Sequence, residues 1–457
     1  MKSSHSAAAM SAVFDDPNLV DAAGLVPLLG LAAQVGLPQL VGEHVRLPGP
    51  AGANAPAKVM TLIAGMAAGA DSIDAMDGLR RAGMSQLFTG VRAPSTLGTF
   101  LRGFTFGHVR QLDAVASRSL VALASTTALL PGVDADCRID IDDTIKGVYG
   151  PGKQGAQFGY TKVRGLNAQV ATISTPSAAP VIAAARLRRG AVPSGKGAPR
   201  LIRDAVATAR RAGATGPILV RADSAYCSAK IVAAITATGA RFSLAMAMNK
   251  RARAAIEGIA ENAWTRIQYP WKIPDPETGE LIDAAEIAEV QYTAFTSKRK
   301  ALWCTARLIV RRVPERNTKK KQKQQQGELF AAYRYHMVFT NSTAELVEAE
   351  STHRGHAVIE QVFADLKDSA LAHLPSGRFA ANAAWLACAT IAFNLTRAIA
   401  VTAGGKLAKA TSATIRERLI KVPARLARSA RRQVLHLPDN WIWATPWTTV
   451  WTAVMTT

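Results

Sequence analysis

The sequence predicts an α/β fold in which a mixed sheet is flanked by helices. Three successive patterns along the 457-residue chain indicate this fold. Helix formers recur at helical spacing over residues 1–130, strand-like and helix-like segments alternate over 131–250, and β-like runs dominate 251–343. We therefore expect a helical N-terminal domain, the first part of an α/β core, and a β-rich insertion. Residues 344–402 complete the core, and 403–457 form a basic C-terminal segment.

The N-terminal segment is predicted to be helical. "LVPLLGLAAQVGLPQLV" and "KVMTLIAGMAAGADSIDAM" carry apolar residues at helical spacing, interrupted by Gly and Pro. In "APSTLGTFLRGFTFGHVRQL", Ser95 or Thr96 follows a proline and is a suitable N-cap. Two interpretations of this stretch stay open, a helix-turn-helix element that reads DNA and an ordinary packing helix.

The core segment has a recognisable order of elements. "CRIDIDDTIKGVYG", "NAQVATIST" and "APVIAAARLRRG" are strand-like, and "LIRDAVATARRAG" is a helix pattern that ends at Gly213. The strand "GPILVRADSAY", the helix "SAKIVAAITATG" and the strand "RFSLAMAM" follow. Three strands, a helix, a strand, a helix and a strand is the order of an RNase H-like core.

The insertion before the last core helices carries β-type periodicity in "TRIQYPW", "AEIAEVQYTAFT", "ALWCTARLIVRRV" and "AAYRYHMVFTN". It also holds the polar low-complexity segment "NTKKKQKQQQGE". We expect the insertion to form a separate β-rich layer that covers the active site.

The composition restricts the possible function. Lys and Arg number 55 against 33 Asp and Glu, a net charge of +22, and a chain this basic usually meets a polyanion. The four cysteines form no CxxC pair, which disfavours a zinc site or disulfide framework and fits a reducing, cytoplasmic compartment. Residues 379–396 are uncharged, but Asn382 and Asn394 lie among them, so a buried helix is preferred to a membrane span.

Acidic residues stand where two predicted strands end. Asp142 lies in "DIDDT" and Asp223 in "VRADSAY". Side chains at such strand ends emerge into a crevice, and a set of carboxylates suits Mg²⁺. Alternation places Asp140 on the same face as Asp142, so spacing alone does not choose between them.

The third acid, Glu360, lies in "HRGHAVIEQVFADLKDSALAHLP", which we predict to be a helix. At about 100° a residue, His353, His356, Glu360 and Lys367 fall within one narrow arc beside an apolar stripe. An amphipathic helix with a solvated polar face explains the spacing equally well.

These segments resemble DDE transposases of bacterial insertion sequences. The narrower resemblance is to the insertion-sequence 1380 family, related to the group with a C-terminal Tyr, Arg, Glu and Lys signature. The resembling segments are "DIDDTIKGVYGPGKQGAQFGYTKVRGLNAQVATIST", "VRADSAYCSAKIV", "HRGHAVIEQVFADLKDSALAHLP" with "FAANAAWLACATIAFNL", and "RRQVLHLPDNWIW".

The resemblance implies an RNase H-like fold and a set of site residues. A hydrophobic-Asp-x-Thr context selects Asp142, followed by Thr144, while Asp223 and Glu360 match the second and third catalytic, metal-binding acids. Lys367 matches the family lysine. The implied cofactor is Mg²⁺, with Mn²⁺ as a substitute, and the implied partners are terminal inverted repeats and target DNA, bound by a homodimer or higher oligomer. Where the wider group has Tyr and Arg, this chain has His353 and His356.

Further DNA contacts are expected from basic stretches. Residues 298–323 and 416–432 are the two most basic segments, and "GKQGAQFGYTKVRG" interleaves cations with Phe158 and Tyr160. These two aromatic residues either stack on a splayed base or pack in a β-hairpin core. Arg425, Arg428 and Arg432 follow Pro423 at helical spacing. The candidate DNA-binding residues are Lys153, Lys162, Arg164, Lys298, Arg299, Lys300, Arg311, Arg312, His356, Lys367, Arg425, Arg428 and Arg432.

Two other functions are compatible with parts of this pattern. A decayed transposase that binds a specific DNA sequence without cutting it would act as a repressor. A metal-independent carboxylate hydrolase would leave the charge of +22 unexplained.

Overall fold

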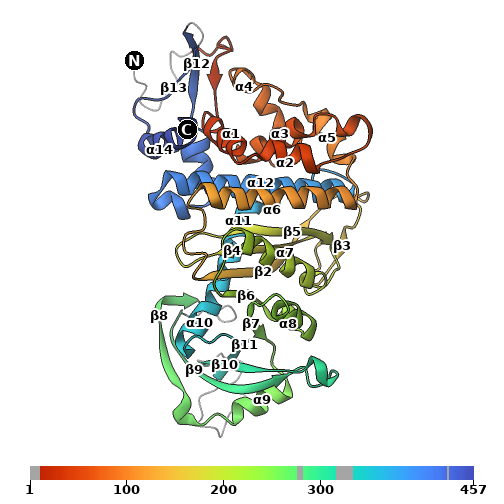
Figure 1. The fold of residues 1–457 in the computed structure, drawn as a ribbon, viewed down its shortest axis with the longest axis vertical. Helices are drawn as coiled ribbons and strands as arrows, with labels where there is room; N and C mark the ends of the chain where they lie inside the picture. The colour runs from red at the N-terminus through yellow and green to blue at the C-terminus, as the bar shows by residue number, and fades with distance from the viewer. Residues whose placement is uncertain (1–10, 275–280, 315–332, 430–431, 457) are drawn as a thin grey trace.

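The computed structural model describes residues 11–274, 281–314, 333–429 and 432–456. Within these ranges, ten strands form one mixed sheet (Figure 1). Its order is β3-β4-β2-β6-β7-β11-β10-β9-β8, and β5 pairs with β4. Helices pack around this sheet, so the predicted α/β class with a mixed sheet flanked by helices is confirmed.

The first part of the sheet contains the predicted core strands. They are β2 (Cys137–Gly147), β3 (Gln157–Phe158), β4 (Arg164–Ser174), β5 (Val181–Arg189), β6 (Ile218–Ala222) and β7 (Arg241–Met246). β4 runs antiparallel to β2 and β5, whereas β6 is parallel to β2 and β7 is parallel to β6. Two helices make the parallel connections, α7 (Ala198–Arg211) and α8 (Ala229–Thr236). Each helix packs an apolar stripe against the sheet. In α7 this stripe includes Leu201, Ala205 and Val206.

The insertion continues the core sheet. After α9 (Lys250–Glu257), its strands are β8 (Thr265–Pro274), β9 (Leu281–Ala294), β10 (Cys304–Pro314) and β11 (Tyr333–Thr340). β11 pairs antiparallel with β7, with Val338 opposite Ala245. The expectation of a separate layer over the site is therefore wrong, because β11 pairs with the open edge of β7, whose backbone groups need partners. The polar segment at 317–328 lies outside the described residues.

The N-terminal helices pack on a helix from late in the chain. They are α1 (Leu25–Gln34), α2 (Leu37–His44), α3 (Ala55–Ala67), α4 (Met84–Leu87), α5 (Pro94–Arg102) and α6 (Phe106–Thr126). Figure 1 shows α6 lying along α12 (Phe379–Ala403), and the two are in contact. The stretch 93–112 forms α5 and the start of α6. α6 buries Leu112, Val115 and Leu120, but a helix that reads DNA also buries one face, so both interpretations stay open.

Helix α12 is the centre of the apolar core. Its side chain Asn394 accepts a hydrogen bond from the backbone nitrogen of Ile182 at 2.8 Å and donates one to the Ile182 carbonyl at 2.9 Å. α12 is long and apolar enough to cross a membrane, but 83% of its most apolar window is buried inside the protein. The bent pair α1–α2 passes the same length and composition test. The burial of α12 fits the prediction of a core helix.

The C-terminal segment differs from expectation. After α13 (Ser412–Ile415), residues predicted to form a basic helix instead form β12 (Ala424–Ser429) and β13 (Arg432–His436), which precede α14 (Ala444–Met455). β12 pairs with β1 (Leu19–Val20) near the start of the chain. Arg425 Nε also donates to Asp16 Oδ2 at 3.0 Å. This long-range pairing outweighs the helical spacing of the arginines.

Candidate active site

The acids of β2 have different environments. Asp140 is fully buried and receives two hydrogen bonds from Arg221 of β6, Nε to Oδ1 and Nη2 to Oδ2, each at 2.7 Å. His356 Nδ1 lies 3.0 Å from Asp140 Oδ1. Because its oxygens are occupied by these partners, Asp140 has a structural role. Of the two rivals on this face, Asp142 is left as the candidate for chemistry.

Arg221 also fixes the segment that carries the last predicted acid. Its Nη1 donates to the carbonyl of Thr352 in α10 (Leu346–Arg354). A Cβ atom at Gly355 would lie 2.9 Å from the same nitrogen, so only glycine fits this contact comfortably. Here the chain forms a 3-10 turn at Gly355–Ala357 before α11 (Val358–Lys367) begins. The predicted single helix with one polar arc is therefore wrong.

Asp142 lies midway along β2, not near its end as predicted, and Asp223 directly follows the end of the neighbouring strand β6. Ile141 of β2 is in register with Ala222 of β6, so the acids that follow these residues are adjacent, where strands are about 4.8 Å apart. Asp142 Oδ1 accepts the Asp143 amide at 2.7 Å, and Asp223 Oδ1 accepts the Ala225 amide at 3.0 Å. The structure thus brings together two of the three predicted acids.

Both carboxyl groups resist ionisation. Burial raises the pKa of Asp142 to about 6, and the charge of Asp223 raises it further. The hydrogen bond from the Asp143 amide and the nearby His356 lower this pKa. The Asp223 side chain reaches solvent, yet partial burial of its carboxyl group raises its pKa as well. The hydrogen bond from the Ala225 amide and the nearby His356 lower this pKa. Two carboxylates that repel each other at a rim open to solvent have the donor chemistry that favours a divalent cation.

Glu360 is not part of this pair. It is exposed on α11, as is Lys367 in the last turn of the same helix. Among the described residues, no group of three His, Cys, Asp or Glu side chains is close enough to hold one metal ion. Asp142 and Asp223 therefore fit a metal, whereas Glu360 does not complete the site in this arrangement.

A comparison with protein families decides what kind of protein carries this pair. A family model described as transposase DDE domain group 1 matches residues 2–456. The chain belongs to this transposase family. A comparison with curated proteins gives no match. The narrower resemblance to the insertion-sequence 1380 family stays a prediction.

Two histidines of the transposase hold the α10–α11 segment against the sheet. His353 Nδ1 lies 2.9 Å from Ser243 Oγ of β7. Burial, with His356 and Arg221 nearby, lowers the pKa of His353 to about 3, so its ring is neutral. The side chain of His356 is only 15% exposed beside Asp140. The expectation that His356 contacts DNA is not supported, since its ring contacts the buried network.

The third acid of β2, Asp143, faces the other side of the sheet. Its Oδ2 accepts hydrogen bonds from Arg188 of β5 and Asn167 of β4. Arg188 also donates to the carbonyls of Ser194 at 2.9 Å and Lys196 at 2.7 Å. Sequence reasoning missed this network, since no local pattern links residues on three separate segments.

The loop after β2 exposes its aromatic residues. Phe158 is 67% exposed and Tyr160 is fully exposed, so the alternative of a hairpin core is wrong. Lys153 donates to the carbonyl of Leu374, and Arg164 donates to the carbonyls of Gly150 and Pro151. These two cations secure the loop, while Lys162 is exposed. The base-stacking alternative is thereby retained.

The basic residues of the insertion fall into two groups. Arg312 is buried between the rings of Trp264 and Tyr333, at 4.2 and 4.5 Å, and pairs with Glu261 and Glu286. This environment contradicts the expectation that Arg312 contacts DNA.

Arg311, beside it, pairs with Glu350 of α10 at 3.2 Å. Lys298, Arg299 and Lys300 are exposed between β9 and β10. These three residues precede the start of β10, whereas Arg311 lies near its end, so the distance along the strand is roughly 25 Å. The predicted clamp residues are therefore not one cluster.

We predict that Asp140→Ala lowers the free energy of unfolding by about 3–5 kcal/mol, because Arg221 stays buried without its carboxylate. Urea denaturation measures the loss. The control is Asp136→Ala, which removes an ion pair with Arg138 at the surface and should cost less than about 1 kcal/mol. Equal losses for the two variants would contradict the structural role of Asp140.

We predict that Asp142→Asn removes a pH dependence of stability in metal-free buffer. The pKa of Asp142 is about 6 in the folded chain and about 3.9 when unfolded, so the folded state binds the proton more tightly. Wild-type stability should therefore fall as pH rises from about 4 to about 6 and then level off. Melting temperatures of the two proteins should agree near pH 4 and differ most above pH 6, with the variant higher.

Proposed function

We propose that this protein cuts DNA at the ends of its insertion sequence and joins the freed ends to target DNA. The observation that carries the proposal is the adjacency of Asp142 and Asp223, just past the last residue pair of β2 and β6, in a chain of the transposase family. The net charge of +22 fits a DNA substrate. An RNase H-like core is supported by the order β5-β4-β2-β6-β7, antiparallel over the first three strands and parallel after them.

Asp142, Asp223 and Glu360 are proposed as the catalytic residues and as the ligands of Mg²⁺, with Mn²⁺ as a substitute. For Glu360 this proposal requires α11 to move toward the other two acids when metal and DNA bind. A bound divalent ion would lower the pKa of a water molecule and offset charge on the phosphodiester. Asp142 and Asp223 supply two adjacent carboxylates, and the Asp140, Arg221 and His356 network holds the segment that leads to Glu360. Hydrolysis frees a 3′-hydroxyl, and that hydroxyl then attacks target DNA.

Exposed cations are proposed to hold the DNA backbone. Lys162 and the base-stacking aromatics Phe158 and Tyr160 follow β2, and Lys367 ends α11. The remaining exposed candidates are Lys298, Arg299, Lys300, Arg425, Arg428 and Arg432. We further propose that terminal repeats and target DNA are bound by a homodimer or higher oligomer in the cytoplasm, without a membrane partner.

A repressor that binds DNA without cutting it is the second candidate. The observation that favours it is the position of Glu360, which stands apart from the other two acids among the described residues. Cleavage assays separate the two functions directly.

We predict that Asp142→Asn, Asp223→Asn and Glu360→Gln each lower cleavage of a labelled terminal-repeat duplex by about 100-fold or more. Each variant removes a charge proposed to hold the metal, so DNA binding should persist. Gel analysis with Mg²⁺ or Mn²⁺ measures cutting, and Asp136→Asn serves as the control. Wild-type protein that binds the duplex without nicking it would favour the repressor, and full activity of Glu360→Gln would remove that residue from the site.

We predict that changing Lys298, Arg299 and Lys300 together to Ala flattens the salt dependence of DNA binding. Each lost phosphate contact should reduce the log–log slope by about 0.9. The comparison protein carries both Arg311→Ala and Arg312→Ala. This double variant loses internal ion pairs, so its stability should fall while the salt slope of DNA binding stays unchanged. An unchanged slope in the triple variant would show that the β9–β10 turn does not hold DNA.

A further inference from the structure

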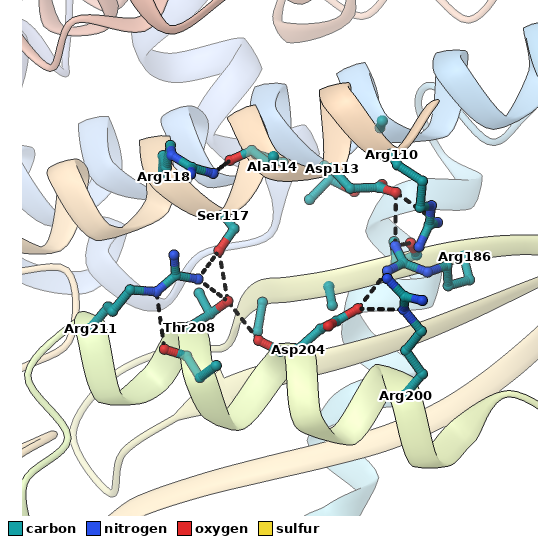
Figure 2. A pocket seen from close by; sticks show the side chains of 17 residues that line it. Arg110, Asp113, Ala114, Ser117, Arg118, Arg186, Arg200, Asp204, Thr208 and Arg211 are labelled. Atoms are coloured by element: carbon teal, nitrogen blue, oxygen red, sulfur yellow. Dashed lines mark hydrogen bonds and ion pairs between the residues drawn. The ribbon is translucent and has the colours of Figure 1, made fainter. Parts of the chain in front are cut away.

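A cavity of about 240 Å³ lies between α6 and α7, away from the two acids described above. Figure 2 shows its lining, in which arginines from both helices and from β5 point toward one another. Apolar groups of α12, including Ala387, contribute another wall. Five arginines and two aspartates line this cavity, an excess of three positive charges. We call it the arginine cavity.

The inner part of the arginine cavity is a chain of ion pairs. Arg110 Nη2 lies 2.7 Å from Asp113 Oδ2, and Arg186 Nη1 contacts the same oxygen at 2.9 Å. Arg186 Nη2 then lies 2.6 Å from Asp204 Oδ2, and Arg200 Nε approaches that oxygen at 3.9 Å. Each carboxylate is thus shared between two guanidinium groups, which leaves positive charge uncompensated.

Two buried atoms of the inner part, Arg110 Nε and Asp113 Oδ2, make no hydrogen bond within the described residues, although two ion pairs hold Asp113 Oδ2. Burial lowers the pKa of Arg110, and the charge of Asp113 acts in the opposite direction. A buried donor without an acceptor is costly, and an anion in the cavity would supply one.

The outer arginines are held by neutral groups. Arg211 Nη2 donates to Ser117 Oγ at 2.8 Å, and its Nε donates to the Ala207 carbonyl at 3.2 Å. Arg118 Nη1 donates to the Ala114 carbonyl at 3.3 Å. These bonds orient the two guanidinium groups without neutralising them, so both keep a full charge for a ligand.

The arginine cavity lies on the opposite face of the sheet from Asp142. Arg186 is in register with Gln169, and Gln169 with Asp143, so these three side chains share one face. Asp142, one residue earlier, faces the other way. A ligand in the cavity is therefore separated from the candidate active site by the sheet.

We propose that the arginine cavity binds a phosphate group, and that the backbone of DNA is its source. The volume is below the roughly 300 Å³ at which sites for drug-sized ligands begin, so it suits one phosphate group better than a whole nucleotide. Arg200 and Arg211 lie about 16 Å apart along α7, close to five base-pair steps of about 3.4 Å, so the rim can follow one strand. Only the choice of DNA as source rests on the proposed function.

The test uses the full chain with three rim residues changed, Arg118→Gln, Arg200→Gln and Arg211→Gln. These side chains are exposed, so the fold should persist. The first arm measures melting temperature with inorganic phosphate against sodium chloride of equal ionic strength. Phosphate should raise the wild-type melting temperature by a few degrees, and the variant should lose this shift. The second arm measures the salt slope of DNA binding, which should fall by between about two and three units.

The matched control removes three exposed cations outside the cavity, by Arg203→Gln, Lys230→Gln and Arg253→Gln. It should keep the phosphate shift and a larger DNA slope than the cavity variant. Loss of the phosphate shift with an unchanged DNA slope would support a free phosphate and overturn DNA as the source. Identical behaviour of cavity variant and control in both arms would overturn the proposal. The melting temperature in phosphate can be measured even if the protein cuts no DNA. Failure of the phosphate site can therefore be told apart from failure of the proposed DNA cleavage.

Discussion

The buried ion pair between Asp140 and Arg221 is the constraint on which the candidate site depends. A charge this deep is tolerated only with a well-aligned partner, and here two strands and the α10–α11 segment supply the groups. Since Asp140 precedes Asp142 by two residues and Arg221 precedes Asp223 by two, the pair aligns both candidate acids. It also sets where α10 ends, because Arg221 donates to the Thr352 carbonyl and lies close to the backbone of Gly355. One interaction thereby positions both strands and the start of the helix that carries Glu360.

The large positive charge of the chain has two distinct uses. Part of it stabilises the fold, as with Arg312 between its aromatic neighbours and Arg188 on Asp143. Another part is exposed, as at Lys298, Arg299 and Lys300. Net charge predicts a polyanionic partner, but it does not tell which cation meets that partner, because burial and pairing are set by the fold. Basic residues close in sequence can therefore have opposite roles.

The sheet and α12 join distant parts of the chain into one body. β11 extends the sheet from β7, so the insertion shares its backbone pairing with the core. α12 packs against α6 and holds the edge strand β5 through Asn394. The polar side chains of α12, such as Asn394, find hydrogen-bond partners inside the protein, so the whole helix can be buried in the core. The same packing forms one wall of the arginine cavity.

Local patterns in the sequence determined the α/β class, the core strands β2, β4, β6 and β7, and helices α7 and α8, because apolar periodicity directly reflects which face of an element is buried. They also placed Asp223 at the end of β6, whereas Asp142, expected near a strand end, lies midway along β2. The tertiary structure alone decided that Asp140 is structural, since its partner Arg221 is 81 residues away. It likewise made residues 424–429 a strand, through pairing with β1 some 400 positions earlier. Such outcomes depend on which distant groups meet, and no local spacing encodes that.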